Sequence, residues 1–110
     1  MTRTGLGELE QLVLLALLRL GRGAYGAALR REIHDRAGRS VSPGTIYPTL
    51  DRLERKGCVR SWMGEPTEER GGRARRHYAL TAAGLAEVRK SWGEVSALAE
   101  GLDAVLNPRG

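Results

Sequence analysis

The chain has 110 residues and a formal net charge of +5, and 41% of its residues are hydrophobic and 28% charged. This length suits one compact domain and is too short for two ordinary ones. The longest apolar run, Leu12 to Leu18, is far shorter than the roughly 20 residues of a membrane span, which argues against a membrane protein, and the one cysteine, Cys58, excludes an internal disulfide and a thiolate metal cluster within the chain.

Residues 8–20 predict a buried helix. Their apolar side chains repeat with helical spacing, and a second apolar flank leaves few polar sides. Such a helix must be covered on nearly every side, which favours contact with a second subunit. Gly21 and Gly23 end it.

Residues 25–37 predict a second, shorter helix that is closed by Gly38. Leu29 and Ile33 face the core, and the charged residues between them form a solvated face. Tyr25 or Gly26 lies one turn earlier on the core side.

Residues 42–56 predict a third helix that ends before Gly57. Ser42 is a favourable N-cap, and Pro43 fits the first helical position, where no N–H is required. Ile46, Leu50 and Leu53 form one narrow apolar stripe. Pro48 removes a backbone donor about one turn in, so we expect an irregular first turn.

The spacing then changes to that of a β-hairpin. Residues 58–63 and 75–80 read as two strands, and the charged segment 64–73 between them has Gly71 and Gly72 at its tip. After the hairpin, Thr81 caps a last helix. Its apolar stripe runs through Leu85, Val88 and Trp92 to Leu106, near the C-terminus.

These elements predict a mainly α fold with a small β-hairpin wing. The order helix, helix, helix, hairpin, helix is that of a winged helix-turn-helix followed by a C-terminal dimerisation helix. We assign residues 1–80 to the winged helix-turn-helix and residues 81–107 to the dimerisation helix.

Four sequence segments resemble the PadR-like transcriptional regulators. The strongest is residues 42–57, which is similar to the recognition-helix signature of that family. Tyr25-Gly26, the segment from Gly71-Gly72-Arg73 to Tyr78, and Leu80-Thr81-Ala82-Ala83-Gly84 agree in order and spacing. The resemblance covers roughly residues 7–100.

The resemblance implies a homodimer in which the C-terminal helix of one chain packs on the first and last helices of the other. It also implies a repressor that is released by a small aromatic or drug-like effector. The expected interface residues are Leu9, Val13, Leu85, Val88, Trp92, Val95, Leu98 and Leu102.

The third helix is the candidate DNA-reading element. Its N-terminus offers free N–H groups and the positive end of a helix dipole to a phosphate. Hydroxyl and guanidinium groups there can bind phosphates or base edges, although the same residues would also suit a solvated surface helix. The candidate contacts are Ser42, Thr45, Tyr47, Thr49, Arg52 and Lys56.

The wing adds a second basic segment. Arg73, Arg75 and Arg76 can pair with phosphates or enter a narrow minor groove. The acidic residues at 65, 68 and 69 could instead neutralise them within the hairpin. We expect the arginines to contact double-stranded DNA.

Trp92 has two interpretations. It can belong to the core of a dimer, or it can line a pocket and stack on a flat aromatic effector, with Leu12 and Ala16 as neighbouring walls.

Charge distribution, localisation and function class complete the sequence predictions. Residues 1–80 contain 15 basic and 9 acidic residues, whereas residues 81–110 contain 3 and 4, and a basic body favours an anionic partner. The absence of a signal-peptide pattern predicts a cytoplasmic protein. His34 and His77 lack further ligands at metal-binding spacing, so we expect no metal and no cofactor. No catalytic set is present at a defensible spacing, which leaves a winged-helix protein-interaction module as the alternative function.

Overall fold

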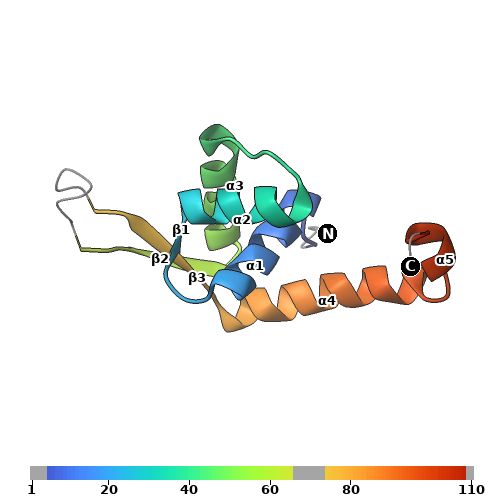
Figure 1. Cartoon of the computed structure of the whole chain (residues 1–110). Coiled ribbons are helices and arrows are strands. Elements are labelled where there is room, and N and C mark those ends of the chain that lie inside the picture. The colour runs from blue at the N-terminus through green and yellow to red at the C-terminus, as the bar shows by residue number, and fades with distance from the viewer. Residues whose placement is uncertain (1–4, 66–73, 109–110) are drawn as a thin grey trace.

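The computed structural model describes residues 5–65 and 74–108, and it is mainly helical with one small sheet, as predicted (Figure 1). In chain order the elements are α1 (Glu8–Leu20), β1 (Ala24–Tyr25), α2 (Gly26–Ala37), α3 (Pro43–Arg55), β2 (Val59–Met63), β3 (Arg76–Leu80), α4 (Ala82–Ala99) and α5 (Asp103–Leu106).

The helices α1 and α2 end at glycines, as the sequence predicts. Gly21 closes α1 with φ +79°, and Gly38 closes α2 in the left-handed conformation. Residues with a Cβ rarely adopt a positive φ, so glycine is favoured at both positions. The predicted bounds of α1 are confirmed.

The helix α3 begins after Ser42, with Pro43 at its first position. The Ser42 hydroxyl makes no bond to a backbone N–H of the helix, and it donates instead to the Thr45 hydroxyl at 3.1 Å. The helix runs through Pro48 without interruption, and its first turn also contains a shorter bond of the 3₁₀ type, from the Thr45 N–H to the Ser42 carbonyl at 3.0 Å. Its backbone bonds begin at Ser42, whose carbonyl accepts from the N–H of Ile46 at 2.9 Å.

The core lies where α1, α2 and α3 meet the sheet. Burial of this apolar set is the main force that holds the helices together. The predicted core positions of α2 and α3, Leu29, Ile33, Ile46, Leu50 and Leu53, are all buried there, together with Val13, Leu14, Leu17 and Tyr78.

The sheet has three antiparallel strands in the order β1-β3-β2. The strand β1 was not predicted, because Tyr25 was assigned to the start of the second helix; Tyr25 instead pairs with His77 of β3. His77 also bonds through Nδ1 to the Gly23 carbonyl and stacks on Trp62, with ring centroids 5.9 Å apart. These contacts tie the base of the hairpin to the α1–α2 loop. The predicted tip, Gly71 and Gly72, lies outside the described residues.

The helix α4 starts against the body and then extends past it (Figure 1). The Thr81 hydroxyl accepts from the Gly84 N–H at 3.0 Å, which confirms Thr81 as the cap. The helix ends at Ala99, Gly101 has φ +83°, and the short α5 follows. A single apolar stripe to the C-terminus is therefore wrong, because the backbone turns at Gly101. None of the helices among the described residues is long and apolar enough to cross a membrane.

Candidate nucleic-acid interface

The outer face of α3 is exposed over its whole length. Ser42, Thr45 and Tyr47 lie on the surface, as predicted. Arg55, which was not among the predicted contacts, is also exposed and takes part in none of the ion pairs found within residues 5–65 and 74–108. The helical spacing that buries Ile46, Leu50 and Leu53 places Arg55 on the opposite side of the helix.

The ring of Tyr47 lies directly over Gly26 at the start of α2. A Cβ at position 26 would come within 2.5 Å of the ring and of the hydroxyl of Tyr47. Only glycine leaves room for this approach. Tyr25-Gly26 and residues 42–57, two of the four segments with a family resemblance, are therefore in direct contact. The Tyr47 hydroxyl lies at the N-terminus of α2.

Thr49 does not point outward, so its predicted place on the DNA-facing surface is wrong. Its side chain is buried, and its hydroxyl donates to the Thr45 carbonyl at 2.7 Å. The same hydroxyl accepts from the guanidinium of Arg52 at 3.2 Å. The apolar stripe of α3 is thus wider than Ile46, Leu50 and Leu53 alone indicated.

Arg52 and Lys56 are drawn toward α1 by Glu10. Lys56 Nζ donates to both carboxylate oxygens, at 2.7 and 3.0 Å, and Arg52 Nε lies 3.6 Å from Oε2. The Gly7 N–H donates to Oε1 at 2.7 Å. Sequence reasoning missed this cluster and treated both cations as free for DNA; they are ion-paired within the chain.

The pKa of the Glu10 carboxyl is lowered by the groups around it. Burial alone would raise the pKa, but the hydrogen bonds from Gly7 and Lys56 and the charges of Lys56 and Arg52 outweigh it. Glu10 is therefore a buried carboxylate that remains ionised at neutral pH.

The two described wing arginines make different contacts. The guanidinium of Arg75 lies 3.9 Å from the centre of the Tyr25 ring. Arg76 Nη1 donates to the Ser61 hydroxyl at 3.0 Å, and that hydroxyl donates to the Glu54 carboxylate. Arg75 is thus held by the sheet, and Arg76 is held by the sheet and, through Ser61, by Glu54 near the end of α3. Arg73 lies outside the described residues.

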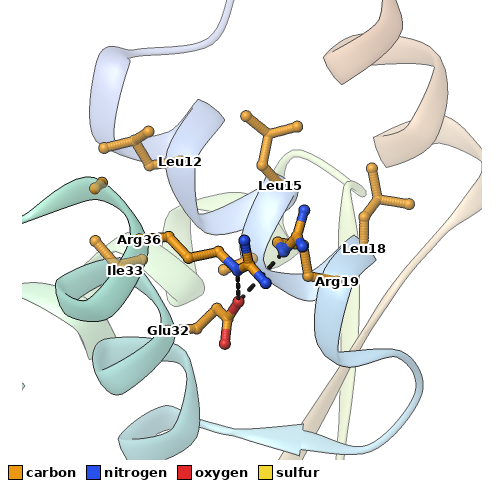
Figure 2. A pocket seen from close by; sticks show the side chains of 9 residues that line it. Leu12, Leu15, Leu18, Arg19, Glu32, Ile33 and Arg36 are labelled. Atoms are coloured by element: carbon orange, nitrogen blue, oxygen red, sulfur yellow. Dashed lines mark hydrogen bonds and ion pairs between the residues drawn. The ribbon is translucent and has the colours of Figure 1, made fainter.

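A largely apolar groove of about 680 Å³ lies between α1 and α2. Leu12 and Ala16, the two predicted effector-pocket residues of α1, both line it. Figure 2 shows Leu12, Leu15 and Leu18 on one face of α1, with Glu32 and Arg36 on α2 opposite. Trp92 is not among the lining residues of the groove.

Glu32 joins the two sides of the groove by ion pairs. Its Oε2 lies 2.6 Å from Nε of Arg36 and 3.3 Å from Nε of Arg19 (Figure 2). The groove thus combines an apolar floor with two partly exposed guanidinium groups. This composition suits a flat apolar ligand that carries a polar group.

The predicted interface residues fall into three groups. Val13 and Val88 are buried in the core of their own chain, so their assignment to a surface between subunits is wrong. Leu9 and Leu85 are half-buried against that core. The remaining four, Trp92, Val95, Leu98 and Leu102, are exposed.

Cys58 is buried, and burial raises the pKa of its thiol. A thiol in this state is a weak nucleophile at neutral pH. Within the described part of the chain, no group of three or more histidine, cysteine or acidic side chains has the geometry of a metal site.

Comparison with known proteins connects this architecture to a family. The sequence model of the "Transcriptional regulator PadR-like family" matches residues 14–90. A Lysinibacillus sphaericus protein described as uncharacterized is 32% identical over 94 residues, which cover 81% of this chain and 82% of that protein. A transcriptional regulator of Mycobacterium tuberculosis is 50% identical over 64 residues, or 56% of this chain and 53% of that one.

Solved structures have the same fold. A PadR family transcriptional regulator from Eggerthella lenta superimposes with a TM-score of 0.69 at 31% identity, covering 91% of this chain and 87% of that one. A PadR family transcription regulator from Clostridium difficile gives a TM-score of 0.72 at 23% identity, covering 92% and 100% of the two chains, and it supports the fold alone. The matched family, the Mycobacterium tuberculosis relative and the Eggerthella lenta structure are all described as transcriptional regulators.

Proposed function

Because the chain belongs to the PadR-like family of transcriptional regulators, we propose that it is a homodimeric repressor that binds specific double-stranded DNA and is released by a small aromatic effector. The observation that carries the proposal is the exposed polar face of α3 beside the arginines of the wing. A helix presented in this way fits the major groove, and a hairpin beside it reaches the backbone or minor groove.

Residues from both elements supply the DNA contacts. Ser42, Thr45 and Tyr47 offer hydroxyls near the start of α3, where the helix dipole favours a phosphate. Arg55, exposed on the outer face, can pair with a phosphate or a guanine. On the wing, Arg73, Arg75 and Arg76 supply backbone contacts; Arg75 and Arg76 are steadied by Tyr25 and Ser61.

A mobility shift with the DNA upstream of the protein's own gene tests this proposal. We expect binding that weakens steeply between about 50 and 200 mM salt, because phosphate contacts release counterions. Thr45→Ala and Arg55→Ala should each weaken it, whereas Arg31→Ala, an exposed arginine of α2 outside the proposed contacts, serves as the control. Binding to a protein partner without any salt-dependent binding to duplex DNA would favour the interaction module instead.

The proposed dimer uses the exposed apolar side chains of α4 and α1. Trp92 is 59% exposed and Leu98 is 84% exposed, and Leu18 of α1 is also on the surface. Apolar patches of this kind are typical of protein interfaces. A twofold dimer would bury these side chains and present two copies of α3 to successive half-sites on the duplex.

The proposed effector site is the groove on α1 and α2, closed by Trp92 of the second copy. Leu12 and Ala16 supply its apolar wall, and Trp92 offers a face for stacking. An effector bound there would change how the subunits pack and hence the spacing of the two α3 helices. Because a changed spacing would no longer match the two half-sites, we propose that the effector releases the repressor from DNA.

Tryptophan fluorescence tests the effector site. Planar phenolic or cationic compounds should quench Trp92 in a Trp62→Phe background, which removes the second fluorophore, and should release DNA in the mobility shift. Binding that is unchanged in Trp92→Ala would exclude Trp92 from the site. Binding that survives Leu12→Trp, which would fill the groove from its partly exposed wall, would exclude the groove.

A further inference from the structure

Glu10 is a buried carboxylate that lies between α1 and the C-terminal half of α3. Its side chain is only 6% exposed, whereas those of Lys56 and Arg52 are 36% and 49% exposed. A carboxylate removed from water is costly unless cations and hydrogen bonds compensate it. Lys56, Arg52 and the Gly7 N–H supply this compensation.

The two cations belong to the helix that the proposed function places on DNA. Thr45, Arg52 and Lys56 follow one flank of α3 at helical spacing. Both cations are partly exposed, so they could reach a phosphate if nothing else held them. In the structure Lys56 Nζ and Arg52 Nε both lie against the Glu10 carboxylate, 46 residues away from Lys56 in the sequence.

We propose that Glu10 acts as an internal substitute for a DNA phosphate, which holds Lys56 and Arg52 against α1 and withholds them from the duplex. The inference rests on the proposed function, since it concerns how strongly α3 binds DNA. Glu10 is thus a positioning residue for α3. Its charge lowers the general, sequence-independent affinity for DNA and leaves recognition to the outer face of the helix.

The test compares Glu10→Gln with Glu8→Gln on a random-sequence duplex. Both variants remove one negative charge from α1, but Glu8 is 83% exposed and pairs at 2.6 Å with Arg39 of the loop between α2 and α3, not with a cation of α3. Glutamine at position 10 keeps an oxygen for the Gly7 N–H and loses the charge that attracts Lys56. The measurement is duplex affinity by fluorescence anisotropy across a range of salt concentrations.

We expect Glu10→Gln to bind roughly tenfold more tightly at low salt for each cation released, with a slope of log affinity against log salt steeper by about 0.9 per released cation. Glu8→Gln should show much less of this gain. Adding Lys56→Met to Glu10→Gln should remove the part of the gain that the released Lys56 supplies. Equal slopes in Glu10→Gln and Glu8→Gln would overturn the inference while the proposed function stands, and no duplex binding by either variant or wild type would overturn both.

A measurement on the wild type guards against misfolding of the variant. The side-chain ammonium of Lys56, followed by nitrogen-15 NMR, should be protected from exchange in the free protein by its bonds to Glu10. Its signal should not move when random-sequence duplex is added. A shift toward the phosphate-bound form would overturn the inference.

Discussion

The body of the molecule, from α1 to β3, and the arm formed by α4 and α5 bury their apolar residues to opposite degrees. In the body, Leu50 and Leu53 are fully enclosed. In the arm, Val95 and Leu98 repeat at a similar helical spacing and are exposed. The same kind of sequence pattern therefore forms a core or an open surface, depending on which other elements of the chain lie against it.

This difference separates the part of the chain that covers its own apolar residues from the part that leaves them exposed. The buried residues of α4, Gly84 and Val88, lie in its first turns. Beyond them no described part of the chain covers the apolar face. The exposed apolar face of the arm is the surface that the proposed dimer would bury.

The largest expected effect is the loss of a core side chain. Leu50→Ala should lower the free energy of unfolding by about 2–5 kcal/mol, because it removes buried contacts and leaves a cavity. Leu98→Ala, with a similar truncation on the arm, should leave the stability of the monomer nearly unchanged. Urea denaturation at low protein concentration measures both, and an equal loss in the two variants would contradict the contrast between body and arm.

The joint between body and arm provides the next test. A Cβ at Gly84 would collide with the Cys58 carbonyl, which is backbone and cannot move cheaply. Gly84→Ala should therefore cost about 1–3 kcal/mol of stability. Gly93→Ala is the matched control in the same helix, since nothing lies near its added methyl group, and it should stabilise by about 0.5–1 kcal/mol. Thermal unfolding would report the opposite signs.

A smaller effect is expected from the arm's aromatic residue. Trp92→Ala should weaken the proposed dimer by about 1–2 kcal/mol, or roughly tenfold in the dissociation constant. Sedimentation at several concentrations measures this change, with the exposed Lys90→Ala as the control. An unchanged dissociation constant would place the interface elsewhere.

The smallest effect is the dependence of stability on acid. The pKa of Glu10 is lowered in the folded chain, so its ion pairs stabilise the fold above the pKa of an unfolded glutamate, about 4.3. This contribution is lost as the pH falls through the folded pKa. When the pH is lowered from 7, the stability of Glu10→Gln should not fall by this contribution. The stability of Glu8→Gln should still fall by it, as in the wild type. Identical pH profiles of stability for the two variants would remove Glu10 as the cause.

Local signals account for the elements that the sequence predicted well. Glycines at 21 and 38, Pro43 and Thr81 mark helix ends by backbone preferences that act over a few residues. The stripe Ile46, Leu50 and Leu53 likewise fixes the inner side of α3.

Features that depend on distant residues escaped prediction. The strand β1 is only two residues long, and it exists because Tyr25 pairs with His77. The ion pairs of Glu10 join helices that are far apart in the sequence. Val88 was assigned to an interface because periodicity identifies an apolar side but not which chain covers it.

In the candidate site, too, some residues were placed correctly from the sequence and others were not. The exposure of Thr45 and Tyr47 follows from the narrow stripe of α3. The burial of Thr49 depends on its hydroxyl bonding back to the Thr45 carbonyl, an arrangement that polarity alone does not indicate.

The contact of Tyr47 with Gly26 has a consequence for how the chain can vary. No side chain fits at position 26 while the tyrosine ring lies over it, so alanine at position 26 requires the Tyr47 ring to move away or to be replaced by a smaller side chain. In a library randomised at both positions, survivors with alanine at 26 should carry a smaller residue at 47. The two positions would then behave as one unit of selection, although 20 residues separate them along the chain.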